Sequence, residues 1–285
     1  MREESSRKIE VPERNSLLAE EDIIAGIGVR RGTSLFLGRF TLGEVLSVLG
    51  KKSFFREARK RGLWPLAFEL DSSAGPLQRL KIFLREKTPE NLIVDLKIRE
   101  GRFTPPGPPI PHFPKRELKA LFLEWLTLQN PVEAFTETRG ALPGQQHPGL
   151  GIGKKVVDVF VYLAKLLRMD CILAFPAYYH NAVLFSRFFH FLRPGKEAEV
   201  QAIRRTFGRL PVRQLAWAVH LNCLKCGGAE AAYEWTADVQ VFPLARDLRD
   251  YFGSKHYREA VKRKLKECRF AMDDDEFERK IRSLD

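Results

Sequence analysis

The sequence predicts an α/β fold, in which a mixed, largely antiparallel sheet is flanked by helices and followed by a C-terminal extension. Two segments with alternating apolar residues, Leu77–Arg85 and Asn91–Arg99, are typical of a β-hairpin. A glycine-rich loop, Gly149–Gly153, leads into the amphipathic segment Lys154–Arg168, which predicts a helix. A short apolar segment, Cys171–Phe175, follows this helix and predicts a strand.

The composition sets limits on size and partners. A chain of 285 residues holds one large domain, or one domain with an appendage. Its 44% hydrophobic and 29% charged residues are typical of a globular protein. The charge of 48 − 36 = +12 favours an anionic partner, but does not choose among a nucleotide-like cofactor, nucleic acid and an acidic membrane surface. Basic residues are interleaved with acidic ones, which favours a solvated surface.

The cysteine content and the distribution of apolar residues predict the cellular compartment of the protein. Four cysteines are too few for a disulfide framework in a chain of this length, so we expect a reducing environment. The segment Met1–Asn15 is polar and lacks the apolar core of a secretory signal. No stretch approaches the roughly 20 apolar residues of a membrane span. We therefore expect a cytoplasmic protein without a membrane partner.

The first predicted helix has a clear start. Thr41 is a plausible N-cap with Glu44 three residues later, and the apolar spacing that follows is helical up to Gly62 and Pro65. Around this helix we expect a flexible lead-in over residues 1–31, a short strand over Ser34–Gly38, a strand over Leu66–Leu70 and a hairpin turn at Lys87–Glu90.

The middle of the chain combines a proline-rich loop with a predicted helix. Thr104–Pro114 contains six prolines and predicts an ordered loop or a spacer. An apolar stripe then predicts a helix over Lys115–Leu128, stopped by Asn130 and Pro131. The stripe consists of Leu118, Leu121, Phe122, Trp125 and Leu126.

A second apolar helix is predicted over Asn181–Leu192, ended by Pro194 and Gly195. Beyond about Lys196 the pattern changes. We expect a domain over residues 32–195 and a mixed or helical C-terminal extension over residues 196–285. Within the extension the expected elements are a helix at Val200–Thr206, a strand or helix at Gln214–Leu224, a strand at Glu234–Phe242 and mostly charged helix over Asp247–Arg282.

The glycine loop is the most informative motif. Gly149, Gly151 and Gly153 precede a helix, whose first turn has unpaired N–H groups and a partial positive charge. Glycine also permits a close approach of the ligand to the backbone. The loop therefore predicts a ligand with a pyrophosphate, or else only a tight turn into a helix. A dinucleotide-binding fold is disfavoured, because no clear parallel strand precedes the loop and no acidic ribose partner is evident.

From Gln146 to Phe191 the order of elements resembles the GNAT superfamily of N-acetyltransferases. In that family a loop of the type Arg/Gln-x-x-Gly-x-Gly/Ala binds the pyrophosphate of acetyl-CoA. The segment Gln146–Gly151 fits this pattern, whereas a second register aligns Gly149–Gly153 with the family's common Gly-x-Gly-Ile-Gly. We favour the second register, because it places Ala164 where the family helix often has alanine.

The following helix adds to the resemblance. Asn181, Ala182 and Phe191 match positions that family members often conserve after the next strand. Ser186 or Phe185 stands where the family commonly has the tyrosine that protonates the departing CoA thiolate. For the family's central fourth strand, the only candidate is Glu133–Arg139.

The resemblance implies an acyltransferase that moves an acetyl or other acyl group from acyl-CoA to an amine acceptor. Acyl transfer needs a neutral amine, donors for the developing oxyanion and a general base. Glu133, Glu137, His147 and His180 are base candidates, and Tyr178 or Tyr179 could donate the proton; of these we select Glu137, His180 and Tyr179. Asn181 could equally be a helix cap. The residues expected to bind acyl-CoA are Gln146, Gly149, Gly151, Ile152, Gly153, Lys154 and Asn181.

Competing signals remain. His220, Cys223 and Cys226 resemble half a zinc site, which Cys268 or His256 could complete only through folding; reduced thiols near a turn are favoured, so we expect no metal. The rival function is a catalytically silent GNAT-like module that binds a protein or nucleic acid. A nucleic-acid partner is not favoured, because acidic residues surround the basic segment Lys262–Lys266.

Overall fold

The computed structural model describes residues 28–29, 35–227 and 232–283. The chain divides into two compact units. The N-terminal unit holds residues 1–99, 125–132 and 149–160, and the C-terminal unit holds residues 100–124, 133–148 and 161–285. Each unit is therefore built from three separate segments of the chain. The lead-in predicted for residues 1–31 lies outside the described residues, apart from the two residues of β1 (Gly28–Val29). The domain boundaries proposed from the sequence stay a prediction.

The predicted α/β class is confirmed. The strands follow the order β1-β2-β3-β4-β5-β6-β9-β7 in a mixed, mostly antiparallel sheet, and β8 and β10 form a separate ribbon. Three elements contribute residues to both units, namely β4 (Leu92–Phe103), β5 (Leu118–Leu128) and α4 (Gly153–Leu166).

In the N-terminal unit, two short helices pack against an antiparallel sheet. α2 (Leu42–Lys51) begins with the predicted capping box, in which the Thr41 side chain accepts from Glu44 N and the Glu44 carboxylate accepts from Thr41 N. α3 (Phe54–Lys60) follows after Ser53, which has a positive φ of 64°. The Phe55 ring contacts Phe68 of the sheet edge to face, with ring centroids 6.3 Å apart.

The strands of this unit agree with the alternating pattern. β2 (Leu66–Asp71) pairs with β3 (Gln78–Leu84), and β3 pairs with β4, both antiparallel. The predicted turn contains the 3₁₀ helix η1 (Pro89–Asn91). The strand predicted at Ser34–Gly38 is wrong over its described part, because Leu37 and Gly38 have positive φ and turn the chain between the bridged residues Phe36 and Phe40.

The helix predicted over Lys115–Leu128 is wrong, because this segment forms β5. The residues Leu118 and Ala120–Leu123 are buried, whereas Lys119, Glu124 and Trp125 are exposed. A strand covered on both faces reads as a continuous apolar run, which periodicity cannot distinguish from a buried helix. Glu133–Arg139, the only candidate for the family's central fourth strand, is irregular.

In the C-terminal unit, β6 (Cys171–Ala174) runs parallel to β5, with Ala120 opposite Cys171 and Leu123 opposite Ala174. β9 (Gln240–Pro243) pairs antiparallel with β6 and also with β7 (His190–Phe191). The predicted helix Asn181–Leu192 is shorter than expected: α5 spans Tyr179–Phe185. Phe189, Phe191 and Leu192 are at most 1% exposed, because the chain turns here to bury them in the core.

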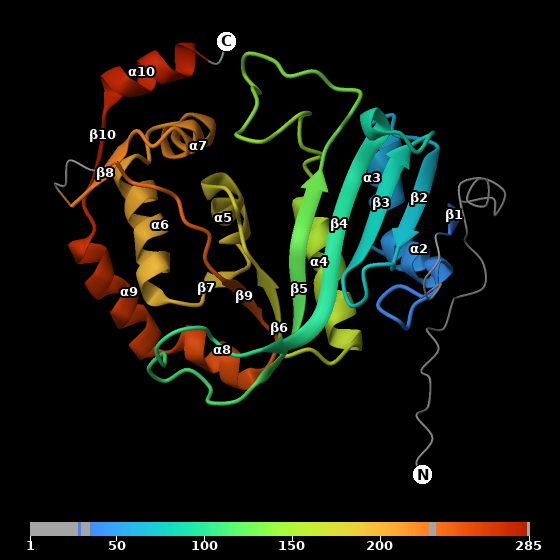
Figure 1. Cartoon of the computed structure of the whole chain (residues 1–285), viewed down its shortest axis with the longest axis horizontal. Helices are drawn as coiled ribbons and strands as arrows, with labels where there is room; N and C mark the ends of the chain where they lie inside the picture. Colours follow the sequence, from blue (N-terminus) through green and yellow to red (C-terminus); the bar gives the residue numbers. More distant parts are fainter. Residues whose placement is uncertain (1–27, 30–34, 228–231, 284–285) are drawn as a thin grey trace. The chain divides into compact units, whose positions relative to one another are not determined.

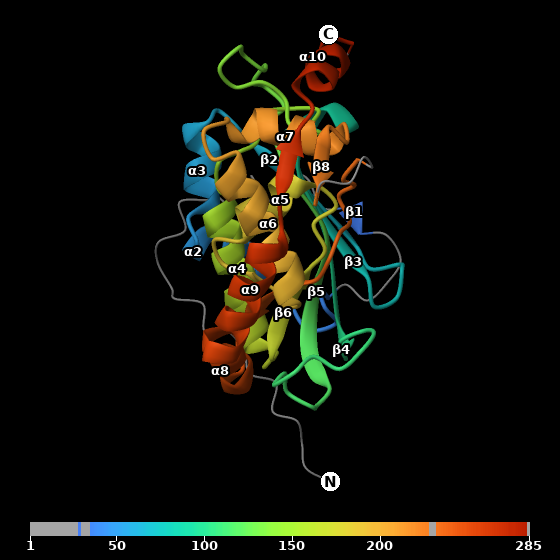
Figure 2. The same ribbon diagram turned by 90° about the vertical axis from the view of Figure 1, so that its left-hand side faces the viewer.

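Pro194 begins a helix rather than ending one. It lies in the first turn of α6 (Pro194–Thr206), where a missing N–H costs nothing. α6 lies beside α9 (Lys255–Glu267), as Figures 1 and 2 show. The remaining elements are α7 (Val212–His220), β8 (Leu224–Cys226), α8 (Arg246–Gly253), β10 (Phe270–Met272) and α10 (Asp274–Arg282).

No helix among the described residues is both long enough and apolar enough to span a bilayer.

Candidate functional site

The glycine loop in the N-terminal unit is held by its apolar residues. Leu150 and Ile152 are 4% and 5% exposed, whereas Gly151, Gly153 and Lys154 are exposed. Leu150 N donates to Leu128 O at the end of β5, over 3.4 Å. Gly151 has a φ of +68°, a left-handed conformation that favours glycine. The alternation therefore anchors the loop and turns its glycines outward.

The backbone donors of this loop are unengaged. Within the described part of the chain, the N–H groups of Gly151, Ile152, Gly153 and Lys154 have no hydrogen-bond acceptor. The next N–H group, that of Lys155, donates to Ile152 O over 2.9 Å. These four groups are the unpaired donors at the start of α4, where the helix dipole favours negative charge. The loop is suited to binding an anion.

Two cations are held beside the loop by one carboxylate. Glu57 of α3 accepts from Arg61 Nη1 over 2.8 Å and from Lys155 Nζ over 3.1 Å. Hydrogen bonds from Arg61 and then Lys155 lower the pKa of Glu57 to about 2. Its carboxylate therefore stays ionised at neutral pH and fixes both cations in place. We name Glu57, Arg61 and Lys155 the charge clamp.

The sequence did not indicate the charge clamp as part of a site. Glu57 and Arg61 form an i,i+4 pair near the end of a helix, a pattern that ordinarily signals only surface stabilisation. Their proximity to Gly151 depends on how α3 packs within the unit. No local signal in the sequence could have found it.

The structure brings together five of the seven predicted acyl-CoA-binding residues. Gly149, Gly151, Ile152, Gly153 and Lys154 lie in the N-terminal unit, and they are consecutive apart from Leu150. The other two belong to the C-terminal unit. Gln146 is exposed in the irregular segment before the loop, and Asn181 is half-buried in α5.

The predicted catalytic residues Tyr179 and His180 are both buried at the start of α5. Each is 3% exposed, and among the described residues the Tyr179 hydroxyl and His180 Nδ1 have no hydrogen-bond partner. Burial raises the pKa of Tyr179, so its hydroxyl keeps its proton at neutral pH. Burial, with the nearby His220, lowers the pKa of His180 to about 4. Glu137 is exposed in the segment 133–148.

His180 belongs to a cluster of aromatic and protonatable rings in the C-terminal unit. The Tyr178 ring stacks on His180 with centroids 5.4 Å apart, and it lies 5.8 Å from the His220 ring. Trp217 of α7 contacts His220 at 5.6 Å and donates from Nε1 to Ala141 O over 2.9 Å. Tyr179 instead contacts Trp235 at 5.6 Å. The side chains of Tyr179 and His180, although adjacent in the sequence, therefore contact different groups of aromatic residues.

The segment 133–148 covers part of this cluster. A Cβ at Gly144 would stand 2.6 Å from the Tyr178 hydroxyl oxygen, and Gly144 has a φ of +76°. Only glycine satisfies both the conformation and the close approach. The segment therefore packs through Gly144 against Tyr178, the N-cap residue of α5, and through Ala141 against Trp217 of α7.

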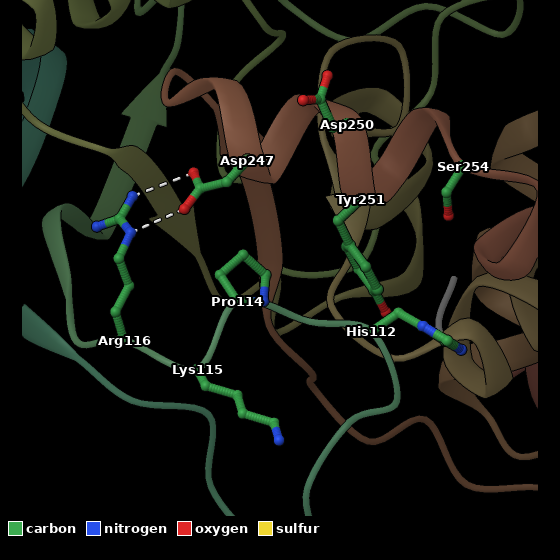
Figure 3. A pocket seen from close by; sticks show the side chains of 8 residues that line it. All are labelled: His112, Pro114, Lys115, Arg116, Asp247, Asp250, Tyr251 and Ser254. Carbon is green, nitrogen blue, oxygen red and sulfur yellow. Dashed lines mark hydrogen bonds and ion pairs between the residues drawn. The ribbon is translucent and has the colours of Figure 1, made fainter.

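A pocket of about 610 Å³ in the C-terminal unit is lined by none of the predicted site residues (Figure 3). Arg116 at its edge forms bidentate hydrogen bonds to Asp247, with N–O distances of 2.8 and 3.1 Å, and a second pair to Asp170. Its guanidinium is thus already satisfied, which favours a structural role. The lining residues are His112, Pro114, Lys115, Arg116, Asp247, Asp250, Tyr251 and Ser254.

No three His, Cys, Asp or Glu side chains are placed to hold one metal ion within the described residues. Comparison of the sequence with protein-family models and with curated proteins gave no match.

Proposed function

We propose that the protein is an acyltransferase that moves an acyl group from acyl-CoA to an amine, as the resemblance to the GNAT superfamily implies. The observation that carries the proposal is the set of four free N–H groups at Gly151–Lys154 beside the charge clamp. A diphosphate presents several acceptor oxygens and negative charge, so it matches both features of this loop.

The strand order supports the same proposal. β5 and β6 are parallel, and α4 with its glycine loop connects them. Their ladder ends at Leu123 and Ala174, whereas β5 continues to Leu128 with no partner on β6 in that register. Trp125, which is 48% exposed, lies on this continuation. The Trp125 indole, which belongs to the same unit as the glycine loop, would contact the pantetheine arm of a bound acyl-CoA.

The chemical step would depend mainly on positioning. A neutral amine attacks the thioester carbonyl, and the CoA thiolate leaves after the intermediate collapses. His180 is neutral at pH 7 and is the candidate base, with Glu137 as the alternative. A base with a pKa of about 4 is far from the operating pH, so we expect it to contribute less than the usual 10²–10⁴-fold. Tyr179, which keeps its proton, is the candidate donor to the thiolate.

Calorimetry with CoA, acetyl-CoA and pantetheine tests the binding step. We expect CoA and acetyl-CoA to bind, and pantetheine, which lacks the diphosphate, to bind at least about tenfold more weakly. Gly151→Asp should abolish CoA binding, because it places a carboxylate among the donors. Gly75→Asp is the matched control: Gly75 has a φ of +66° and open space around it. Absence of heat with millimolar CoA would overturn the proposal.

The rival function is a catalytically silent GNAT-like module that binds a protein or nucleic acid. The burial of Tyr179 and His180 favours it, because buried side chains cannot reach a substrate without movement. Release of free CoA thiol from acetyl-CoA in the presence of an amine panel separates the two functions. Binding of CoA without thiol release would favour the silent module. Retention on heparin that persists above physiological salt would favour a nucleic-acid partner.

A further inference from the structure

The ribbon formed by β8 and β10 places two thiols on one face. Its register pairs Cys226 with Phe270, and Gly227 N donates to Arg269 O over 2.8 Å, which extends the pairing by one residue. The backbone of Cys268 is extended, with φ −76° and ψ 121°. Side chains alternate along an extended chain, so Cys268 and Phe270 lie on the same face. Cys226 and Cys268 are therefore diagonal neighbours on that face.

The surroundings of the two thiols agree with this placement. Both are half-buried and pack against the same hydrophobic cluster in the C-terminal unit. Burial raises the pKa of Cys268, and the nearby Cys226 thiol raises it further. The Cys-x-x-Cys spacing, by contrast, does not join its two thiols here. Asp273 N donates to Cys223 O over 2.9 Å, which extends the pairing to Cys223; because Cys223 is three residues from Cys226 along this extended chain, the two point to opposite faces of the ribbon.

We propose that Cys226 and Cys268 form a reversible disulfide when the protein meets a small-molecule disulfide oxidant such as oxidised glutathione. The thiolate of one cysteine attacks the glutathione disulfide, forms a mixed disulfide and releases one glutathione thiolate. The second cysteine, as its thiolate, attacks the protein sulfur of the mixed disulfide and releases the second glutathione thiolate. The two cysteines lose two protons and two electrons, and one glutathione disulfide becomes two thiols.

The geometry requires a small movement. Diagonal neighbours across an antiparallel pair lie about 7–8 Å apart, slightly beyond the usual 4.4–6.8 Å between the Cα atoms of a disulfide. Strands of three residues in a two-stranded ribbon twist readily, which allows this closure. Because the raised pKa of Cys268 keeps it protonated at neutral pH, the reaction should be slow at pH 7 and faster at pH 9.

The chain supplies its own controls. Cys171 is fully buried in β6, and the Cys223 thiol is 1% exposed and donates to Leu221 O. Neither should react in the folded protein. In the Cys268→Ser variant we expect Cys226 to stop at the mixed disulfide with glutathione. In the Cys223→Ser variant we expect the same cross-link as in the unaltered chain.

The experiment is treatment of the folded full chain with oxidised glutathione at pH 7 and pH 9, followed by alkylation of free thiols and peptide mapping. We expect a mass loss of about 2 Da, corresponding to two hydrogens, a peptide joining Cys226 to Cys268, and full reversal by a reducing agent. Glutathione adducts without the cross-linked peptide would overturn the proposal, as would a Cys223–Cys226 link. The outcome is independent of CoA binding.

Discussion

Arg61 and Gly151 approach each other closely within the N-terminal unit. A Cβ built on Gly151 would stand 4.0 Å from Arg61 Nη2, while Arg61 Nη1 is bound to Glu57. One nitrogen of the guanidinium is thus fixed by the carboxylate, and the other lies beside the exposed loop backbone. Glycine at 151 keeps the space open in front of a cation that is already oriented.

Arg61→Gln should weaken CoA binding without unfolding the unit. Loss of one charge-assisted contact to a phosphate should raise the Kd for CoA by about tenfold, or ~1.4 kcal/mol, and reduce its salt dependence. Lys60→Gln is the matched control, because Lys60 lies 3.8 Å from the same carboxylate but is 63% exposed. Calorimetry at two salt concentrations measures both effects. An equal loss of affinity for pantetheine would contradict a role at the diphosphate.

Gly144→Ala should destabilise the C-terminal unit. The left-handed φ costs a non-glycine residue about 1–2 kcal/mol, and overlap of the new Cβ with the Tyr178 hydroxyl should add about 1–3 kcal/mol. Gly227→Ala carries only the first cost, because Gly227 has a φ of +71° and nothing within 4 Å. The free energies of unfolding from urea titration test the difference. Equal destabilisation of the two variants would show that the segment 133–148 does not press on Tyr178.

Arg116→Met should reduce the free energy of unfolding at neutral pH and make it less dependent on pH in the acid range. Hydrogen bonds from Arg116 lower the pKa of both Asp170 and Asp247 below the usual value of 3.8. A carboxylate with a lowered folded-state pKa stabilises the protein above its unfolded pKa, and this contribution is lost as the pH falls through the folded pKa. We expect a loss of about 1–2 kcal/mol at pH 7, discounted for partial exposure, and a flatter stability curve below about pH 4.

Arg102→Met is the control for this change. Arg102 pairs with Glu117 over 2.8 Å, but both side chains are at least half exposed, so its loss should cost less than about 0.5 kcal/mol. Denaturant titration of both variants between pH 7 and pH 2.5 measures the difference. Equal losses in the free energy of unfolding for the two variants would contradict a larger contribution of the bidentate Arg116 pairs to stability.

His180 should titrate only in strong acid. Its pKa of about 4 lies below the ordinary value of 6.5, so the unfolded chain binds the proton more readily. The resulting stability is complete above pH 6.5 and is lost progressively as the pH falls toward 4, by up to ~3 kcal/mol. The imidazole NMR signals of His180 should not move between pH 8 and pH 5.5. His180→Leu should remove this part of the pH dependence, whereas replacing the exposed His256 by Gln should not.

Local patterns in the chain were sufficient for the hairpin strands, the capped start of α2 and the amphipathic helix after the glycine loop, but the single helix predicted from Thr41 to Gly62 is broken at Ser53 into α2 and α3. Each depends on neighbouring residues, as with the reciprocal hydrogen bonds of Thr41 and Glu44. For β5, local patterns predicted the wrong structure, a helix. Leu118, Leu121 and Trp125 fit a helical stripe, but the run Ala120–Leu123 is buried on both faces of β5, and a strand covered on both faces is apolar at consecutive positions. Long-range pairing overrode local periodicity.

The exposed glycine backbone with unpaired donors at the start of α4 followed from three glycines ahead of a helix, because backbone conformation and helix-terminal donors are local properties. The charged side chains beside the loop could not be predicted in this way. Glu57 and Arg61 lie about 90 residues before Gly151 in the chain, and their place beside the loop arises from the packing of α3. The burial of Tyr179 and His180 is also a property of the assembled core. The sequence by itself determines the chemistry of each side chain and the local backbone conformation. Burial and proximity are decided by the tertiary structure, because they arise only when distant segments pack together.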